Sequence, residues 1–509
     1  MNLLFFIIIL LMGGFLAWLS GKWSSILPRI ISLIAVFINF IITVYIAFNR
    51  DSYGKGTWMI DYKANWIKSF GIGLHLSLDG LSLLLLLLTF FLGIIAVLIS
   101  WKEITKNIGF YHFNLMWILA GIVGVFLSMD LFLFYFFWEL MLIPMYFLIG
   151  IWGHENRIYA SYKFFIFTQA SGLLMFISIL ALYFIHGANT GIYTFDYEQL
   201  LGTKMSESMA MILMFGFLVA FLVKLPVVPF HSWLPDAHTE APTAGSLILA
   251  GLLLKTGAYG LLRFIIPLFP TAAVSFAPYG MLMGVVGILY GAKLAFSQTD
   301  LKRLVAYTSV SHMGFVMLGV FALNELAYQG VVMQMIAHGI STGALFILVG
   351  QLYERIHTRD ITKMGGLWAK VPVMGAVGLI FSMASLGLPG LGNFIAEFLI
   401  LMGVCKVSVW MTCLASVGLI AATIYSLRFV QKVFLGTDHY EGKIWDLSVR
   451  EKLISAVLVI IIVWLGLMPQ PVLNMAKPAI LNTLSAKEKN AEKPGAYLFH
   501  PANNIKDIQ

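Results

Sequence analysis

The stretch FLVKLPVVPFHSWLPD, residues 221–236, places a lysine and three prolines inside a run that is otherwise apolar enough to lie in a membrane. Proline removes a backbone donor and blocks the preceding helical turn, so it leaves carbonyl groups without partners. At membrane depth such groups are tolerated only inside protein or beside water. The stretch therefore predicts a broken membrane helix with a charged residue, Lys224, at the break.

The whole chain is apolar. Of its 509 residues, 60% are hydrophobic and only 11% are charged. Runs such as LSLLLLLLTFFLGIIAVLI, residues 81–99, approach the roughly 20 residues that cross about 30 Å of hydrocarbon. We expect an all-α polytopic membrane protein whose first apolar run, residues 2–20, is a retained helix rather than a cleaved signal.

Hydrophobic windows separated by glycine, proline and charged residues predict about fourteen transmembrane helices. The division between the fourth and the fifth depends on Ser128 to Asp130 alone. The expected spans are 2–20, 27–48, 79–100, 111–129, 131–150, 160–186, 209–234, 243–266, 277–296, 302–322, 326–350, 373–404, 408–430 and 452–470.

The distribution of basic residues predicts the orientation. The net charge of +8 does not indicate a nucleic-acid-binding protein, because Lys and Arg are scattered through short loops without a basic face. With the N-terminus outside, the loops assigned to the cytoplasm carry most of these residues, so we expect both termini outside. The polar tail, residues 486–509, is expected to be poorly ordered or docked on a partner.

A second interrupted helix is expected at SLGLPGLGNF, residues 385–394, in the twelfth span. Interrupted helices at matching places point to inverted repeats around a transport site. The seventh and twelfth spans are five apart, so a second five-helix unit would enter from the opposite face. The expected division is three N-terminal helices (1–110), a first repeat (111–266), a second inverted repeat (267–434), and a last helix with a polar tail (435–509).

Six ionisable side chains lie near the middle of predicted spans, where a charge costs roughly 2.5 to 3.5 kcal/mol on insertion scales. They are Glu139, Lys224, Lys255, His312, His338 and Glu397. Such residues usually face a protein interior or a water-filled cavity and mark an ion or proton path. Their common depth predicts a row across the membrane midplane. Under the repeat, Glu139 would correspond to His312 and Lys224 to Glu397.

Acid, base and imidazole groups suit proton transfer. Moving Glu139 away from Lys224 would help to release a proton from the lysine, and bringing them together would reload it. Imidazoles can relay protons near neutral pH. A structural alternative stays open for each residue: the Glu139–Lys224 pair could brace two helices, Lys255 could bond the carbonyls of a broken helix, and either histidine could only pack. Glu397 could cap the second half-helix after Asn393.

Other charges and motifs favour simpler interpretations. Arg263 and Lys302 lie near span ends, where we expect their charges to snorkel to the interface. Nucleotide-binding, zinc-protease and serine-hydrolase motifs are absent. A metal site at HSWLPDAH, residues 231–238, is an alternative to a simple helix end. Cys405 and Cys413 are expected only to pack.

Several long stretches carry a family resemblance. They are WELMLIPMYFLIG (138–150), KLPVVPFHSWLPDAHTEAPTAGS (224–246), GLLLKTGAYGLLR (251–263), TDLKRLVAYTSVSHMGF (299–315), MIAHGISTGALF (335–346) and LGLPGLGNFIAEF (386–398). Over nearly the whole chain the sequence resembles the antiporter-like membrane subunits of respiratory complex I, the proton-pumping NADH:quinone oxidoreductase. Glu397 stands where sister chains of that family tend to carry lysine.

The resemblance implies fourteen helices, inverted repeats and a pump module without redox cofactors. It implies that Glu139 and Lys224 form the input pair, Lys255 is the central relay and Glu397 is the terminal site. His312 and His338 match relay positions, and His231 is a candidate supporting residue. NADH, FMN, iron–sulfur clusters and quinone would bind other subunits of a complex in the bacterial inner membrane, including sister antiporter-like chains.

Two other function classes remain possible from the sequence. A cation/proton antiporter subunit of the multisubunit sodium/proton type resembles this family and shares its lysines. A membrane scaffold, in which the charged pairs only hold helices together, is the structural alternative. Normal redox-linked proton uptake with intact assembly after replacement of Lys224 and of Glu139 by Ala would leave only the scaffold.

Overall fold

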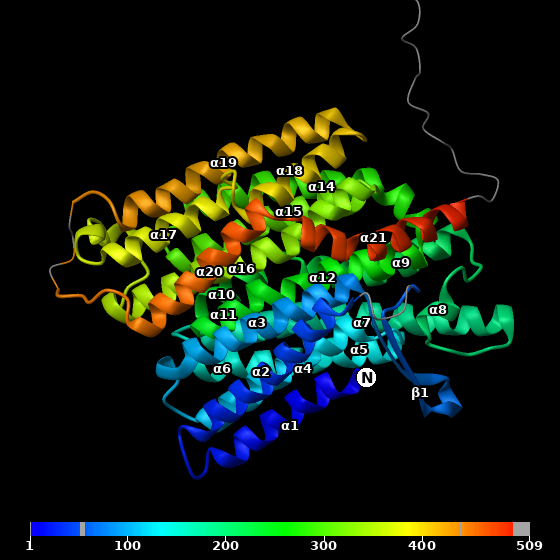
Figure 1. Ribbon diagram of the computed structural model, residues 1–509. Helices are drawn as coiled ribbons and strands as arrows, with labels where there is room; N and C mark the ends of the chain where they lie inside the picture. The colour runs from blue at the N-terminus through cyan, green and yellow to red at the C-terminus, as the bar shows by residue number, and fades with distance from the viewer. Residues whose placement is uncertain (1, 51–55, 438–439, 441, 492–509) are drawn as a thin grey trace, which may run out of the picture.

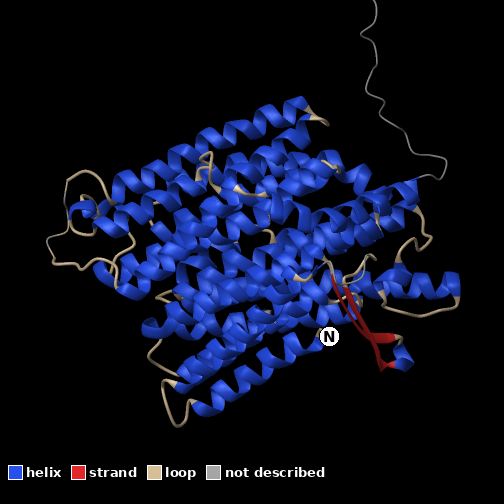
Figure 2. Cartoon of the chain, viewed as in Figure 1, coloured by secondary structure: helices blue, strands red, loops and turns tan. Residues whose placement is uncertain are grey.

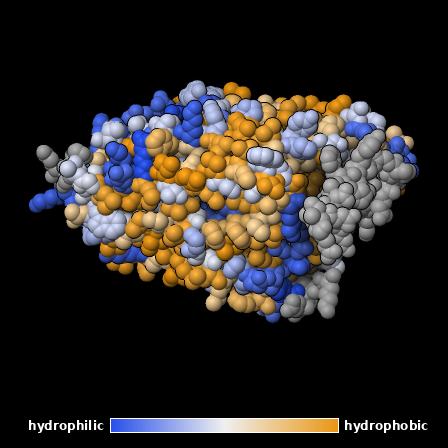
Figure 3. Space-filling view, turned by 90° about the horizontal axis from the view of Figure 1, so that it is seen from above, coloured by the Kyte–Doolittle hydropathy of each residue, from blue (hydrophilic) through white to orange (hydrophobic). Residues whose placement is uncertain are grey.

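The computed structural model describes residues 2–50, 56–437, 440 and 442–491. Helices make up most of this part of the chain, and a single hairpin of two strands projects from one end of the bundle (Figure 2). The helices run side by side with similar directions (Figure 1). A broad apolar band separates two hydrophilic ends of the surface (Figure 3), as expected for a bundle that crosses a membrane.

The elements follow the chain in four groups. The first holds α1 (Leu4–Ser20), α2 (Leu27–Phe48), β1 (Ile60–Ile67), β2 (Ile72–Leu78) and α3 (Gly80–Glu103). The second holds α4 (Ile108–Leu127), α5 (Leu131–Leu140), α6 (Leu142–Trp152), α7 (Arg157–Thr190), α8 (Tyr197–Leu200), α9 (Glu207–Lys224), α10 (Trp233–Glu240), α11 (Thr243–Ile248), α12 (Leu254–Gly260) and α13 (Ile266–Leu268). The third holds α14 (Pro270–Ser297), α15 (Leu301–Phe321), α16 (Glu325–Ile356), α17 (Pro372–Ser385), α18 (Gly392–Cys405) and α19 (Val409–Val433). The last holds α20 (Val449–Leu467) and α21 (Gln470–Ala491).

Within the described residues, 11 helices are long and apolar enough to cross a membrane, or up to 12 if the bent pair α20 and α21 counts as one span. Three further apolar helices, α1, α17 and α18, are shorter. Each predicted span falls on one of these helices or on a broken one. The weak division at Ser128 to Asp130 is confirmed, because α4 ends at Leu127 and the Asp130 carboxylate caps α5 through the amides of Phe132 and Leu133.

Both predicted helix breaks are present. The helix α9 ends at Lys224 and α10 begins at Trp233, whose indole N–H donates to the Val223 carbonyl at 2.9 Å. The indole thereby satisfies one of the carbonyls that the break exposes. In the twelfth span, α17 and α18 are separated by a turn in which Gly387 has a φ of +78°, a conformation that favours glycine.

The spans at the centre of the bundle are the segment Thr243–Leu268 and helix α16, whose apolar windows are entirely buried. The first is not a regular α-helix: two π-helical segments, Leu249–Leu253 and Leu261–Ile265, flank α12. Single π-turns inside helices are frequent at functional sites. Lys255 lies on α12 and His338 on α16, so both occupy the best-shielded part of the molecule.

The strands β1 and β2 were not predicted. They pair antiparallel, with Lys63 opposite His75. Gly71 makes the tight return with a φ of +65°, and a Cβ there would lie 2.1 Å from the carbonyl oxygen of Tyr193. The N-terminal end of α1 and the far end of α21 lie at the same end of the bundle as this hairpin (Figure 1).

Two short backbone bridges recur at corresponding places along the chain. Leu131 N–H donates to Phe195 O and Tyr197 N–H to Met129 O, both at 2.8 Å. The second bridge has the same pattern: Leu301 N–H donates to Arg359 O and Ile361 N–H to Thr299 O, both at 2.9 Å. The first bridge joins the residues before α5 to the connection after α7. The second joins the residues before α15 to the connection after α16.

Two smaller predictions are corrected or limited. Cys405 and Cys413 are both exposed, so a packing role in the interior is wrong. The predicted polar tail begins inside α21, because the helix continues to Ala491, and the rest of that tail lies outside the described residues.

Candidate functional site

Five of the six candidate residues are almost fully buried. Lys255 and His338 are 0% exposed, Lys224 and His312 1%, and Glu397 2%. Glu139 is only partly buried and packs against α7, where a Cβ on Gly172 would lie 2.5 Å from the Glu139 Oε1 atom. The depth predicted from the sequence therefore corresponds to real burial in the bundle.

Four of these side chains form a row, which we call the Lys255–Glu397 row. The Lys255 Nζ atom lies 2.8 Å from His338 Nδ1, and His312 Nδ1 lies 2.8 Å from Glu397 Oε1. The two imidazole rings between them have centroids 5.4 Å apart. The row thus links α12, α16, α15 and α18 through groups that can gain and lose protons.

Neutral polar groups surround the outer part of this row. Gln334 Nε2 lies 3.4 Å from Glu397 Oε1, and the hydroxyls of Ser385 and Tyr425 each lie 3.4 Å from His312 Nε2. These groups fix the orientation of the imidazole without adding a charge. The inner end of the row is fixed by the main chain, because the Lys255 ammonium also donates to Ala250 O at 2.5 Å. Ala250 belongs to the first π-helical segment.

Glu139 and Lys224 are not in contact. No ion pair within 4 Å joins them among the described residues, and neither Lys224 Nζ nor Glu139 Oε1 has a hydrogen-bond partner there. The Lys224 ammonium instead lies over the rings of Trp138, at 5.3 Å, and Phe164, at 5.5 Å. A cation over an aromatic face is stabilised by the ring quadrupole, more strongly when desolvated.

Lys224 and Glu397 lie in the two spans that the predicted repeat pairs, but on different sides of the helix breaks. Lys224 is the last residue of α9, before its break, whereas Glu397 lies inside α18, after the other break. The residue that ends α17 is Ser385, which contacts His312. The charged residue therefore lies before the helix break in the first half and after the helix break in the second half.

His231 and His238 lie outside the row. The His231 ring contacts Tyr290 and Tyr307, with centroids 5.6 and 6.4 Å away, and makes no hydrogen bond to the row. His238 is 0% exposed and stacks on Phe346 at 4.5 Å, and neither of its ring nitrogens has a hydrogen-bond partner among the described residues. No group of three His, Cys, Asp or Glu suited to a metal ion is found in the part of the chain that the structure describes.

Two buried cations were misjudged from the sequence. Arg263 is 6% exposed and pairs with Asp79 at the start of α3, and Lys302 is 1% exposed and donates to Ala241 O at 2.7 Å. Neither side chain snorkels, so that prediction is wrong. The available signal for Arg263 was its place in the same continuous apolar stretch as Lys255, with Asp79 immediately before another such stretch.

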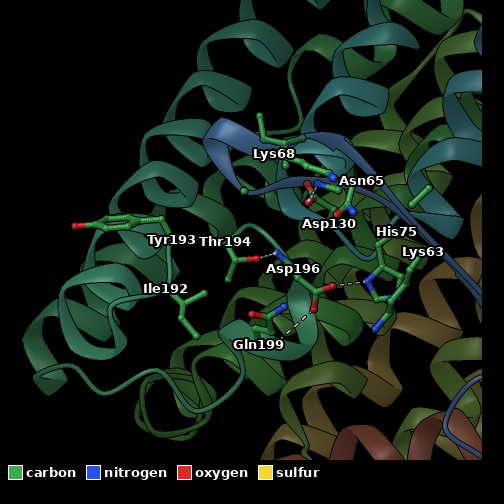
Figure 4. A pocket seen from close by; sticks show the side chains of 14 residues that line it. Lys63, Asn65, Lys68, His75, Asp130, Ile192, Tyr193, Thr194, Asp196 and Gln199 are labelled. Atoms are coloured by element: carbon green, nitrogen blue, oxygen red, sulfur yellow. Dashed lines mark hydrogen bonds and ion pairs between the residues drawn. The ribbon is translucent and has the colours of Figure 1, made fainter.

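A cleft of about 490 Å³ lies between the hairpin and the connection after α7 (Figure 4). His75 bridges two carboxylates there, with Nδ1 2.8 Å from Asp196 and Nε2 2.9 Å from Asp61. Burial alone would lower the pKa of His75, but the hydrogen bond and charge of Asp196, together with Asp61, raise it. Burial raises the pKa of the nearby Asp130 carboxyl to about 6.

Comparison with known proteins identifies the family. Residues 128–423 match the family model described as NADH:quinone oxidoreductase/Mrp antiporter, TM. The chain belongs to this family. It is 53% identical over 482 residues to NADH-quinone oxidoreductase subunit M of Pseudomonas aeruginosa, covering 92% of this chain and 95% of that protein. It is 52% identical over 489 residues to the subunit M of Escherichia coli K12, covering 94% and 96%.

Solved structures of the family share the fold. A chain of respiratory complex I from Thermus thermophilus superposes with a TM-score of 0.86 at 30% identity, covering 96% of this chain and 99% of that chain. A chain of the Mrp complex from Dietzia superposes with a TM-score of 0.84 at 20% identity, covering 95% and 98%. The Mrp likeness concerns the fold alone, whereas the subunit M likeness extends to half of all residues.

Proposed function

We propose that this chain is a proton-translocating subunit of an NADH:quinone oxidoreductase and has no redox site of its own. The observation that carries the proposal is the Lys255–Glu397 row, two hydrogen-bonded pairs of titratable groups whose imidazole rings face each other with centroids 5.4 Å apart. Buried ionisable residues are costly in a membrane and are usually functional. The high identity to proteins named subunit M, over almost the full length, supports the same conclusion.

The row can pass a proton by local steps. The Lys255 ammonium donates its proton to His338 Nδ1, and the imidazolium releases one from its other nitrogen, Nε2, which has no hydrogen-bond partner in the described part of the chain. A bridging water or a ring rotation then carries the proton across to His312. His312 passes it to Glu397, whose second oxygen, Oε2, accepts no hydrogen bond from the residues that the structure describes and can hand the proton on.

Glu139 and Lys224 form the input pair in this proposal. At 4 Å and an effective dielectric near 20, an opposite charge stabilises a buried ammonium by about 4 kcal/mol. With Glu139 apart from it, Lys224 keeps only the aromatic contacts of Trp138 and Phe164. Approach of the glutamate would then favour proton uptake by Lys224, and its withdrawal would favour release toward Lys255.

We also propose about fourteen transmembrane helices, with two inverted five-helix repeats at 111–266 and 267–434. The eleven long apolar helices would be joined by α1, the α17–α18 pair and α20. The two matching backbone bridges support the inverted relation, because one lies beside the hairpin and the other, through Arg359, touches Thr239 at the opposite end of α7. Both termini would lie outside the cytoplasm.

The redox chemistry belongs to other subunits in this proposal. NADH, FMN, iron–sulfur clusters and quinone would bind elsewhere in the complex, and sister antiporter-like chains would be neighbours in the bacterial inner membrane. The names of the relatives support membership in such a complex. A sodium/proton antiporter subunit is the second candidate, favoured by the shared fold with the Mrp chain. Its 20% identity gives it less support than subunit M has.

Lys224→Ala and Glu139→Ala test the proposal in the assembled complex. We expect either variant to lower redox-linked proton uptake by inverted membrane vesicles, while electron transfer from NADH to quinone persists when an ionophore removes the gradient. Normal pumping by both fully assembled variants would leave only a structural role for the pair. Sodium-dependent transport in the absence of redox turnover would instead favour the antiporter.

A further inference from the structure

A small cavity of about 10 Å³ lies close to His312 and is lined by residues of α15, α16, α17 and α19. A void of this size, measured by the positions open to the centre of a water, holds about one water molecule. Every residue of its lining is at most 4% exposed. Five of these residues carry a hydroxyl group, and we call this set the hydroxyl box: Thr308, Ser382, Ser385, Tyr425 and Ser426.

Two hydroxyl groups of the box have nothing to bind. Those of Ser382 and Ser426 lack a hydrogen-bond partner in the part of the chain that the structure describes. A hydroxyl inside a helix can donate to a carbonyl about one turn back, as Thr308 does to Val305 O at 2.7 Å. Ser382 in α17 and Ser426 in α19 do not use this option. Because an unpartnered buried polar group is costly, ordered water is its usual partner where the site is polar and roomy enough.

Two other hydroxyl groups of the box face His312. The oxygens of Ser385 and Tyr425 each lie 3.4 Å from its Nε2 atom. This is longer than the roughly 2.7 to 3.2 Å of most hydrogen bonds between nitrogen and oxygen. The two groups come from different helices, α17 and α19, and the direct contacts alone hold them weakly. A water in the box would bridge them to Ser382 and Ser426 and fix their positions.

The contacts of His312 also determine which ring nitrogen carries the hydrogen. Its Nδ1 atom lies 2.8 Å from Glu397 Oε1. A carboxylate can only accept, so the hydrogen lies on Nδ1, and Nε2 of the neutral imidazole is an acceptor. The hydroxyls of Ser385 and Tyr425 must therefore act as donors toward Nε2. A water that donates to their oxygens leaves their hydrogens free for this purpose.

We propose that the hydroxyl box binds one water molecule and that Tyr425 is a positioning residue for His312. Together they keep the Nδ1 hydrogen of His312 on Glu397 and leave its Nε2 lone pair available for the next proton. This inference rests on the proposed function and names the groups that orient its central relay. Uptake forms one N–H bond at Nε2, and hand-over breaks the N–H bond at Nδ1 and forms one O–H bond on Glu397. One proton is released for each one received, and no other reactant is required.

A density map of the assembled complex, at a resolution that shows ordered water, tests the binding site. We expect one water within hydrogen-bonding distance of Ser382 Oγ and Ser426 Oγ. The double variant Ser382→Ala, Ser426→Ala removes the two unpartnered hydroxyls and should lose this water. An empty box in a map of the unmodified complex that shows other buried waters of this chain would overturn the site.

Tyr425→Phe tests the positioning role, because it removes the hydroxyl and keeps the packing of the ring. We expect redox-linked proton translocation by inverted membrane vesicles to slow about tenfold, the effect of leaving one buried acceptor without its donor. We also expect the His312 ring to turn, so that Nδ1 leaves Glu397. A packing role predicts an unchanged rate and an unchanged ring. Tyr328→Phe is the matched control, because Tyr328 is fully buried and its hydroxyl lacks a partner among the described residues, but it does not line the box.

One further variant separates this inference from the proposed function. If Tyr425→Phe and the serine double variant pump at the normal rate while His312→Ala does not, the hydroxyl box has no part in proton transfer and the proposed function stands. If His312→Ala also pumps at the normal rate, the Lys255–Glu397 row no longer supports the proposed function.

Discussion

The two halves of the proposed path differ in how their charges are connected. In the second half, Lys255, His338, His312 and Glu397 form a nearly continuous row of contacts. In the first half, Glu139 and Lys224 stand apart, and the ammonium rests on aromatic rings. The row needs only a bridging water or a ring rotation between its two imidazoles, whereas the input pair must move before it can interact. The difference indicates that proton movement is gated in the first half.

Breaking the row at its centre should have the largest effect. His312 is the group that contacts both His338 and Glu397, so His312→Ala removes the connection between them. Loss of a positioned acid–base group typically costs roughly 10²- to 10⁴-fold in rate. We expect proton translocation to fall toward that range, measured by fluorescent-dye quenching in inverted vesicles. His312→Gln keeps one hydrogen bond and serves as the packing control, and its full activity would argue against an imidazole relay.

Changing the charge at the end of the row should have the next largest effect. Glu397→Gln keeps the shape but cannot take up a proton, so we expect impaired translocation. Glu397→Lys restores a titratable group and should retain part of the activity. Proton uptake rates of the two variants measure this order. Pumping at the full rate by Glu397→Gln would remove Glu397 from the path.

A third prediction compares the two backbone bridges. His75 anchors the bridge at Asp196, whereas Arg359, which stays charged, anchors the bridge at Asp300. Because the folded-state pKa of His75 is raised above 6.5, its contribution is fully present below pH 6.5 and is lost as the pH rises through the raised value. The opposite shift at Asp196, toward a pKa below 3.8, protects the contact until strongly acidic pH.

Amide hydrogen exchange measures this difference directly. We expect the hairpin amides of β1 and β2 to lose protection above the raised His75 pKa, while amides at the Asp300 bridge keep theirs over the same pH range. His75→Gln should abolish the pH dependence at the hairpin. Equal pH dependence at both bridges would contradict the assignment.

The smallest effect should come from the aromatic support of Lys224. Trp138→Phe keeps a ring under the ammonium but weakens the cation–π contact, which is worth about 0.5 to 2 kcal/mol in total. We expect only a modest, few-fold change in translocation, much less than for Lys224→Ala. Phe164→Leu is the companion variant, since Phe164 provides the second ring. A loss as large as that of Lys224→Ala would mean that Trp138 has a further role.

Much of this architecture could be predicted because membrane burial leaves a local record in the sequence. Apolar length predicted the spans, proline and glycine predicted both breaks, and the cost of intramembrane charge selected five residues that are almost fully buried. The family resemblance added their expected order along the path. Each of these signals depends on a few neighbouring residues.

Contacts between residues far apart in the chain could not be predicted from local sequence patterns. The contact of His312 with Glu397 and the burial of Lys302 depend on which helices touch. The hairpin, with its alternating polar residues, was hidden among loop-like composition, and Arg263 was misjudged because its partner, Asp79, lies far away in the chain. The exposure of Cys405 likewise depends on which helix face looks outward.

The most direct test of the central claim is the number of protons translocated per NADH oxidised by the assembled complex carrying Lys255→Met. In the proposed path Lys255 is the first member of the row after the input pair, and methionine keeps most of its packing without a titratable group. The account predicts a lower proton-to-NADH ratio than in the unmodified complex, with electron transfer retained when the gradient is released. An unchanged ratio in the fully assembled variant would contradict it.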